Sequence, residues 1–192
     1  MQQHNQHSQT NTGYRIWPVG LFRRKGSHTR AVSGDAFVEA MRGSATGVNI
    51  VTTDGPAGRF GLTVSAFSSV SAEPPSVLVC VNQKSPACAA IRENRQFCVN
   101  VLSTEQRELA NTFAGMPAGG DPYDFDRASW KSVATNSPVL EKSVAGFDCV
   151  LNSAIDAGTH TIFIGVVSAV TGNNGNPLLY TNRSFRRSCC DA

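Results

Sequence analysis

Apolar and polar residues alternate through the segment from Gly58 to Ser71, which is the most distinctive pattern in the chain. Neighbouring side chains on a strand point to opposite faces, so the alternation predicts one strand with two unlike faces. The apolar face, which can pack against a core, carries Leu62, Val64, Ala66 and Val70. The other face carries small hydroxyls with Phe67 among them, namely Thr63, Ser65, Ser69 and Ser71. Small side chains leave room beside the backbone for a flat ligand with a phosphate, although an edge strand without a ligand fits the pattern equally well.

Shorter patterns elsewhere predict more strands than helices. Apolar and β-branched runs indicate strands at residues 47–53, 77–81, 96–102, 144–155, 159–170 and 178–180. Helices are expected at 36–42 with Asp35 as the cap, after Ser85, and from the capping box of Ser103 and Gln106 to Gly115. Residues 116–136 are expected to form a long loop with aromatic anchors, and the residues after 180 a tail. Many short strands with few helices indicate an antiparallel barrel with helices packed outside.

The connection from Asn82 to Pro86 has the composition of an anion site. Ser85 is a favoured N-cap and proline suits the first helical position, so a helix begins here. The amino terminus of a helix presents free N–H groups and a partial positive charge, which suit a phosphate. Asn82, Lys84 and Ser85 are therefore candidate phosphate ligands, while an ordinary connection from a strand to a helix explains the same residues.

The length of 192 residues suits one folded domain, which we place at residues 33–185. Residues 1–32 are polar, basic and poor in apolar side chains, so a disordered extension is expected, followed at the other end by a tail over 186–192. The net charge of +3 arises from these two ends, and no basic stripe marks the folded part, so nucleic acid is not an expected partner. No apolar run approaches the roughly 20 residues that cross a bilayer, so no membrane association is expected.

The six cysteines form no C-x-x-C pair and His160 is the only histidine in the folded part, so no metal site is expected. Cys80, Cys98 and Cys149 lie in apolar runs, where a reduced cysteine behaves as a small hydrophobe. With no signal peptide at the polar amino terminus, this usage indicates a cytoplasmic protein. No motif for nucleophilic, metal-dependent or phosphate-loop catalysis is present, so no catalytic residue is assigned.

Five segments taken together resemble the short-chain flavin reductase family, whose members are the reductase components of two-component flavin-dependent monooxygenases. In the order in which the family has them, the segments are 58–75, 82–85, 97–102, 158–161 and 177–180. The resemblance covers about residues 35 to 185. It implies a mainly β, FMN-binding split barrel of antiparallel Greek-key topology that forms a homodimer.

The resemblance also implies roles for the candidate site residues. Along the isoalloxazine ring of FMN or FAD it places Thr63, Val64, Ser65 and Ala66, with Ser69, Val70 and Ser71 nearby. Asn82 and Ser85, with Lys84 between them, would approach the ribityl-phosphate end. His160 corresponds to the histidine of the family's Gly-Asp-His motif, which is associated with nicotinamide binding. Thr159 stands where the family usually has Asp, so His160 lacks its adjacent carboxylate.

The implied function is reduction of FMN or FAD by hydride from NADH or NADPH. Reduced flavin then leaves for a separate monooxygenase that acts on an aromatic or similar substrate. The cofactors carry the chemistry of such a reaction, which suits a chain without obvious acid–base machinery. Two alternatives stay open, namely a barrel like pyridoxamine-phosphate oxidase that acts directly on a small molecule, and a non-catalytic module that binds flavin or haem.

Overall fold

The computed structural model describes residues 31–188 of the chain. The chain divides into Met1–Ser33 and Gly34–Ala192, and the helices and strands described below all belong to the second unit. Most of the expected extension over residues 1–32, and residues 189–192 of the expected tail, lie outside the described residues, so these parts stay predictions.

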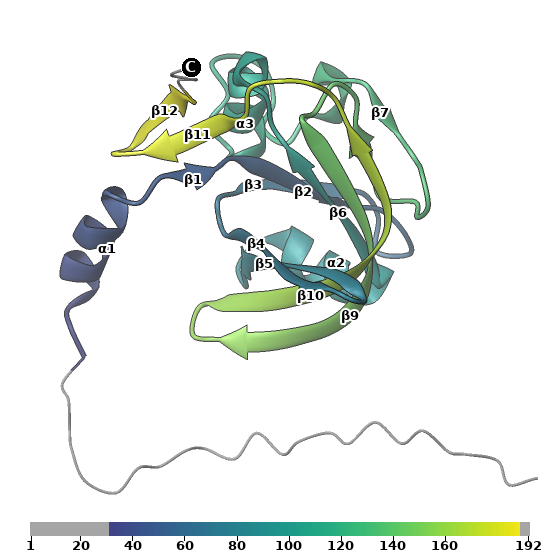
Figure 1. The fold of residues 1–192 in the computed structure, drawn as a ribbon, viewed down its shortest axis with the longest axis horizontal. Coiled ribbons are helices and arrows are strands. Elements are labelled where there is room, and N and C mark those ends of the chain that lie inside the picture. The colour runs from purple at the N-terminus through teal and green to yellow at the C-terminus, as the bar shows by residue number, and fades with distance from the viewer. Residues whose placement is uncertain (1–30, 189–192) are drawn as a thin grey trace, which may run out of the picture. The chain divides into compact units, whose positions relative to one another are not determined.

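The second unit is built on one antiparallel sheet of seven strands (Figure 1). Each strand is antiparallel to its neighbours in the sheet. In spatial order the strands are β3 (Phe60–Val64), β2 (Asn49–Thr53), β6 (Gln96–Val101), β9 (Ala145–Ala157), β10 (His160–Gly172), β5 (Pro75–Asn82) and β4 (Phe67–Ala72). The prediction of a mainly β, antiparallel fold is confirmed.

The two edges of this sheet, β3 and β4, follow one another directly in the chain. Only Ser65 and Ala66 separate them, although five strands lie between them in the sheet order. Two residues span at most about 7 Å, so the sheet must curve until its edges meet. The N–H of Cys80 on β5 donates to the Ala66 carbonyl at 3.1 Å, which fixes the link between the two edges. The result is a barrel that is split where β3 ends and β4 begins.

The single strand expected over residues 58–71 is therefore wrong, because the chain leaves the sheet at Ser65. Leu62 and Val64 pack against the core as the alternation predicts. Beyond the break the phase of the alternation is lost, and a register shift between Ser69 and Ser71 disturbs it again. Val70 is consequently 48% exposed, whereas Phe67 packs against the core.

The interior of the barrel is filled by apolar side chains from most of its strands, including Val51, Val79, Phe97, Cys149 and Phe163. Strand β5 contributes Val77, Val79 and Val81, all buried, as its continuous apolar run predicts. Strand β10 passes so close to its neighbours that a Cβ on Gly165 would lie 2.6 Å from the Phe97 ring and 2.8 Å from the Cys149 Cβ. Glycine is thus required there by packing rather than by backbone conformation.

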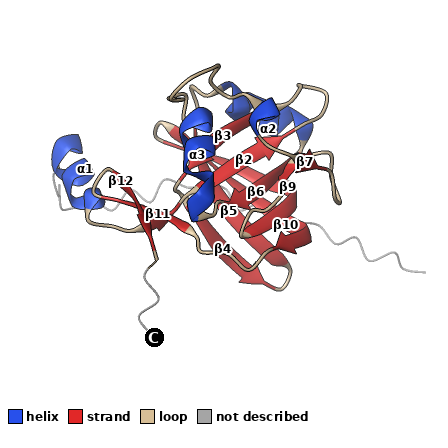
Figure 2. Ribbon diagram, turned by 90° about the horizontal axis from the view of Figure 1, so that it is seen from above, coloured by secondary structure: helices blue, strands red, loops and turns tan. Residues whose placement is uncertain are grey.

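Three helices accompany the sheet, and their positions agree with the sequence patterns (Figure 2). Helix α2 (Pro86–Asn94) has Ser85 at its N-cap and buries Cys88 and Ile91 in the barrel core, so it closes the barrel rather than lying outside it. Helix α1 (Gly34–Arg42) begins before Asp35, which therefore lies within the helix and does not cap it. Helix α3 (Arg107–Phe113) follows a 3-10 turn, η1 (Thr104–Gln106), where the Gln106 Oε1 accepts from the Ser103 N–H at 2.9 Å.

A second apolar cluster lies between α3 and the long loop that follows it. The aromatic anchors expected in this loop are present, since Phe113 packs edge-on to Phe125 and Trp130 with ring centroids 5.0 and 5.6 Å apart. The Trp130 Nε1 donates to the Phe125 carbonyl at 2.8 Å. The loop also contains the turn η2 (Phe125–Arg127) and the strand β7 (Trp130–Lys131), which pairs with β8 (Val139–Leu140).

A separate sheet of three short strands contains the carboxyl-terminal part of the described chain. Its order is β1 (Thr46–Gly47), β11 (Leu178–Thr181) and β12 (Ser184–Arg187). Strand β11 agrees with the predicted last strand, but the tail expected directly after it is wrong because β12 pairs with β11. The sequence of β12 has a single apolar residue, Phe185, so no alternation marks it as a strand.

The buried cysteines give a prediction about reactivity. Burial, and secondly the negative charge of Asp148, raises the pKa of the Cys149 thiol to about 12, and burial raises that of Cys98 as well. Because only the thiolate reacts, we expect iodoacetamide at about pH 8 to leave both thiols unmodified in the folded protein and to alkylate both in urea. Peptide mapping by mass spectrometry measures this, and equal alkylation of Cys149 with and without urea would contradict it.

The same thiols are expected to affect stability in alkali. In the unfolded chain they release protons above about pH 8.5, whereas in the folded chain they hold them. The free energy of unfolding should therefore fall as the pH rises from that value towards 12.

Candidate functional site

A cavity of about 230 Å³ lies at the split of the barrel. We call it the histidine cavity, and it is lined by Leu62, Thr63, Val64, Ser65, Ala66, Cys80, Asn82 and His160. The structure thus brings together the predicted ring contacts Thr63 to Ala66, the predicted phosphate ligand Asn82 and the predicted nicotinamide contact His160. These residues come from three separate parts of the chain.

Asn82 and His160 meet because they are directly paired across β5 and β10. Side chains of a cross-strand pair lie on the same face of the sheet, so both can reach one ligand. The Asn82 Oδ1 accepts from the Lys84 N–H at 2.9 Å, which leaves its amide nitrogen for another partner. The Gln83 Nε2 donates to the His160 carbonyl at 3.2 Å and ties the connection after β5 to the start of β10.

The imidazole of His160 is positioned by the residue that departs from the family pattern. The Thr159 Oγ1 lies 2.9 Å from the His160 Nδ1, within hydrogen-bonding distance. The nearest acidic residue along the hairpin, Asp156, is engaged elsewhere. The hydrogen bond from Thr161, and to a smaller extent the Arg92 guanidinium, lowers the pKa of the Asp156 carboxyl. A hydroxyl thus occupies the position beside His160 that a carboxylate would otherwise take.

The break in the strand at Ser65 and Ala66 frees backbone donors. Among residues 31–188, none accepts a hydrogen bond from the N–H of Ser65 or of Ala66. Both residues line the histidine cavity and are exposed. An unpaired N–H is a strong donor, and two successive ones form a site for a negatively charged oxygen or nitrogen. Two unpaired donors beside this cavity suit a ligand that carries negative charge.

The Thr63 hydroxyl is not free for a ligand, although the alternation placed it on the face left open for one. Its Oγ1 donates to the Ala110 carbonyl at 2.8 Å. This bond attaches β3 to α3, so the hydroxyl proton is not available to a ligand.

A second cavity of about 280 Å³ is lined by residues that adjoin those of the histidine cavity in the chain, namely 59–61 before Leu62 and 85–87 after Asn82, together with two aromatic residues of the long loop. We call it the helix-end cavity. It is lined by Arg59, Phe60, Gly61, Ser85, Pro86, Ala87, Tyr123 and Phe125. Ser85 is the N-cap of α2, but its side chain makes no capping hydrogen bond, so its hydroxyl can hold an anion together with the Ala87 N–H. Pro86 has no N–H, and the Cys88 N–H donates to the Ser85 carbonyl at 2.9 Å. Arg59 adds a positive charge that is shared with Asp54, whose Oδ2 lies 2.8 Å from the Arg59 Nε.

Four of the predicted site residues are not part of these cavities. Lys84 is exposed in the connection and lines neither of them. Ser69, Val70 and Ser71 are exposed on β4, beyond the split. A hydrogen bond from the Ser71 Oγ to the Glu73 carbonyl at 2.9 Å holds the turn that follows β4.

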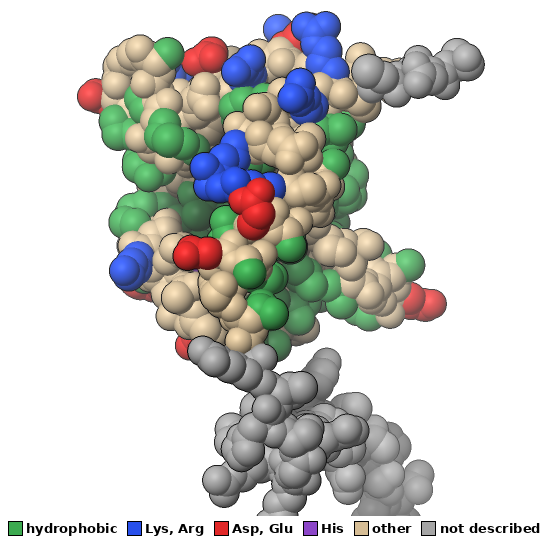
Figure 3. Space-filling view, turned by 90° about the vertical axis from the view of Figure 1, so that its left-hand side faces the viewer, with side chains coloured by type: hydrophobic (Ala, Val, Ile, Leu, Met, Phe, Trp, Pro, Cys, Tyr) green, Lys and Arg blue, Asp and Glu red, His purple; other side chains and the backbone are tan. Residues whose placement is uncertain are grey.

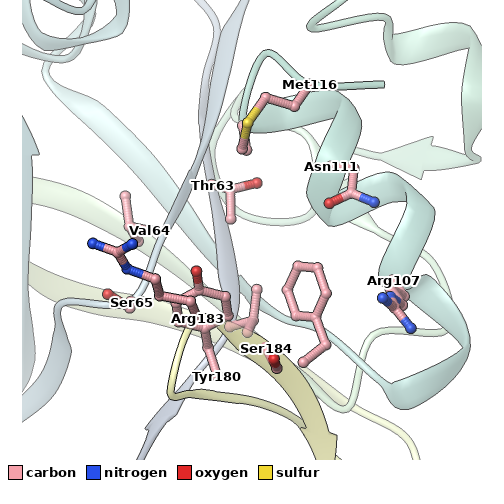
Figure 4. Close-up of a pocket in the computed structure, with 12 residues that line it drawn as sticks. Thr63, Val64, Ser65, Arg107, Asn111, Met116, Tyr180, Arg183 and Ser184 are labelled. Carbon is pink, nitrogen blue, oxygen red and sulfur yellow. The ribbon is translucent and has the colours of Figure 1, made fainter. Parts of the chain in front are cut away.

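The largest of the three cavities, about 420 Å³, is lined mainly by residues that the sequence did not suggest (Figure 4). We call it the arginine cavity. It shares Thr63, Val64 and Ser65 with the histidine cavity and adds, among others, Arg107, Asn111, Met116, Tyr180, Arg183 and Phe185. These side chains come from α3, from Met116 in the loop that follows it, and from the β11–β12 hairpin. No local motif joins the two elements, so only the structure reveals the cavity.

Neither a metal site nor a membrane-spanning helix is found among the residues that the structure describes. Within that range, no three His, Cys, Asp or Glu side chains are grouped in a way that could hold a metal ion. No helix between residues 31 and 188 is both long and apolar enough to cross a membrane.

Comparison with known proteins gives matches over most of the chain. Residues 41–188 match the model of the flavin reductase-like domain. The chain is 40% identical over 152 residues to FMN reductase (NADH) RutF of Serratia proteamaculans, an alignment that covers 78% of this chain and 85% of the relative.

Solved structures give similar matches. The NADH:FAD oxidoreductase SgcE6 of Streptomyces globisporus is 32% identical with a TM-score of 0.74, and the match covers 85% of this chain and 99% of that one. BorF, the flavin reductase component of a bacterial two-component tryptophan halogenase, is 33% identical with a TM-score of 0.72, with 81% and 98% covered.

Proposed function

Because the chain belongs to the flavin reductase-like domain family, we propose that it uses NADH to reduce FMN and releases the reduced flavin to a separate monooxygenase. One observation carries the assignment of the site. Ser65 and Ala66, whose N–H groups have no acceptor among residues 31–188, line the same cavity as His160, at the split of the barrel. Donors for a developing negative charge and a side chain for the nicotinamide thus lie around one space.

The residues of the histidine cavity would hold the flavin ring. Val64, Ser65 and Ala66 line the cavity, and Asn82, which also lines it, offers its amide nitrogen. A bound flavin accepts the hydride of the nicotinamide. The protein would contribute position and electrostatics, since the N–H groups of Ser65 and Ala66 could donate to a bound ring that gains negative charge.

The helix-end cavity would hold the phosphate of the flavin. The Ser85 hydroxyl, the amino terminus of α2 and Arg59 are donors or positive groups on its lining. The two cavities share no lining residue, but their linings are neighbours in the chain, since Phe60 and Gly61 line one and Leu62 to Ala66 the other. FMN carries a single phosphate at the end of its ribityl chain, so a ring in one cavity and a phosphate in the other would suit it.

Replacing His160 by Ala is expected to raise the KM for NADH about 3- to 10-fold, the effect of losing one hydrogen bond, while the KM for FMN changes less. Steady-state kinetics with each substrate varied in turn measure both constants. Thr159→Val, which removes only the hydroxyl beside the imidazole, is the matched variant and should give a smaller rise. An unchanged KM for NADH in the His160→Ala variant would remove His160 from the nicotinamide site.

The reduced flavin would leave the site for a partner enzyme. The residues around Ser65 are exposed, which favours exchange of the ligand with solvent. BorF serves a two-component halogenase, which shows that the family includes reductases with a separate acceptor enzyme. A homodimer is part of the proposal, supported by the exposed apolar side chains Phe37, Val38 and Met41 on α1. The reduced cysteines and the use of NADH favour the cytoplasm.

The test is NADH oxidation, followed by its absorbance, with purified protein and added FMN, FAD or no flavin. Rapid turnover only with added flavin is the expected result, with the lower KM for FMN. NADPH in place of NADH is expected to be the poorer donor. Flavin binding without turnover would support a binding module, and turnover only with another small molecule would support an oxidase like pyridoxamine-phosphate oxidase.

A further inference from the structure

We propose that the arginine cavity binds the adenosine diphosphate moiety that NADH and FAD share. The inference rests on the proposed function, because it extends the same site. It assigns a role to the largest of the three cavities, which the binding of FMN alone leaves unused. The volume of about 420 Å³ lies within the roughly 300–1,000 Å³ typical of small-molecule sites.

The charge of the cavity favours a diphosphate. Arg107 and Arg183 lie on its lining, and none of its lining residues is acidic. Neither arginine takes part in an ion pair with any residue between 31 and 188. Figure 3 shows the side of the molecule that lies at the left in Figure 1. Lys and Arg side chains gather on its upper part, where Figure 1 places β11 and β12. Guanidinium groups are the side chains best suited to phosphate oxygens.

The conformation of Arg183 is a second, independent observation. Asn182 and Arg183 form the turn of the β11–β12 hairpin, with φ angles of +49° and +58°. A two-residue turn of this kind favours glycine at its second position, and an arginine there is unfavourable for the backbone. The side chain extends from this turn across the cavity toward Val64 and Ser65 (Figure 4). Arg183 thus adopts an unfavourable backbone conformation and extends its guanidinium toward Val64 and Ser65, which line both the arginine cavity and the histidine cavity.

The remaining lining suits an adenine base. Tyr180 and Phe185 pack together with ring centroids 5.5 Å apart, and both line the cavity. The Arg107 guanidinium lies over the Phe185 ring, 5.4 Å from its centroid, so Tyr180 is the ring left to stack on the flat face of a base. Asn111 projects from α3 into the cavity (Figure 4). Its Nδ2 donates to the Glu108 Oε1 at 3.5 Å, and its Oδ1 can accept from the amino group of adenine.

The two cavities are also contiguous. Thr63, Val64 and Ser65 line both the arginine cavity and the histidine cavity. A dinucleotide with its reactive ring beside His160 can therefore pass over Ser65 and place its adenosine diphosphate between α3 and the β11–β12 hairpin.

The first test is a calorimetric titration with ADP as the probe, which needs no turnover. The wild type should bind ADP, and Arg183→Gly should bind it at least about 10-fold more weakly, because a charge-assisted contact is lost. Glycine suits the turn, so the hairpin is retained and the thermal unfolding midpoint should not fall. Arg187→Gln, on the same hairpin but outside the cavity lining, is the matched control for Arg183→Gln and should bind like the wild type. No ADP binding by the wild type, or equal binding by the Arg183 variants, would overturn the proposal.

KM values for four substrates show whether the cavity binds the adenosine diphosphate moiety of NADH or that of FAD. Substrates with and without adenosine diphosphate are compared in pairs, NADH with reduced nicotinamide mononucleotide and FAD with FMN. A rise in KM confined to NADH assigns the cavity to the nicotinamide dinucleotide, and one confined to FAD assigns it to the flavin. An equal rise for all four substrates would overturn the proposal. Failure of the wild type to oxidise NADH with FMN would instead count against the proposed function, while the ADP titration still tests the cavity.

Discussion

Replacing Ala66 by proline is expected to lower the kcat for NADH-dependent reduction of FMN by about 100-fold or more, the usual effect of losing one donor to a developing negative charge. Proline has no N–H, and the Ala66 N–H donates to no residue between 31 and 188, so no existing backbone bond is broken. The carbonyl of Ala66, which accepts from the Cys80 N–H, is kept.

Two further measurements make this result specific. Ser65→Ala keeps the neighbouring N–H and removes only a hydroxyl, so it should retain most of the activity. The thermal unfolding midpoint of Ala66→Pro should stay close to that of the wild type, which separates a lost donor from a lost fold. Wild-type kcat in a folded Ala66→Pro variant would exclude this N–H from the stabilisation of the reduced ring.

Replacing Asp148 by Ala is expected to lower the free energy of unfolding by about 3–5 kcal/mol. The carboxylate is 1% exposed. It accepts from the N–H groups of Ala134 and Thr135 at 2.8 and 2.7 Å and from the Thr135 Oγ1 at 2.5 Å. Without it, these donors lose their acceptor and the segment before β8 loses its attachment to β9. Urea unfolding followed by circular dichroism measures the change.

The matched variants separate hydrogen bonding from charge. Asp148→Asn keeps one acceptor oxygen and should cost less than Asp148→Ala. Asp121→Ala removes the same charge from an exposed position and should change stability by less than about 0.5 kcal/mol. A loss in the Asp148→Ala variant as small as that of Asp121→Ala would show that the buried hydrogen bonds contribute little.

Local signals in the sequence were sufficient for many elements of the fold. Pro86 after Ser85 marks the start of α2, and the run from Val77 to Val81 marks a buried strand, because each depends on neighbouring residues alone. The break at Ser65 has no such signal. Apolar and small polar residues continue to alternate across it, and the bond that fixes it comes from Cys80 on another strand.

The residues of the candidate site divide in the same way, into those with a local signal in the sequence and those without one. Asn82 was predicted as an anion ligand from its own segment, and its meeting with His160 follows from the pairing of β5 with β10. The alternation placed Ala66 on the core face, which is wrong because Ala66 is exposed at the break, and its place in the site was implied only by the resemblance to the family. Arg107 and Arg183 could not be predicted, because their relation exists only when the β11–β12 hairpin lies beside α3. Strand β12 has one apolar residue and gave no pattern to detect.

The two-residue link between β3 and β4 also has a consequence for folding. Three hairpins, β2–β3, β4–β5 and β9–β10, can each form early from residues near one another in the chain. Because the link ties β3 to β4 from the start, the barrel closes only when β6 has paired with both β2 and β9 and when β10 has paired with β5. The β4–β5 hairpin already places Ala66 beside Cys80, but Asn82 meets His160 only through the β5–β10 pairing, so the ability to bind flavin belongs to the completed barrel and to none of its hairpins.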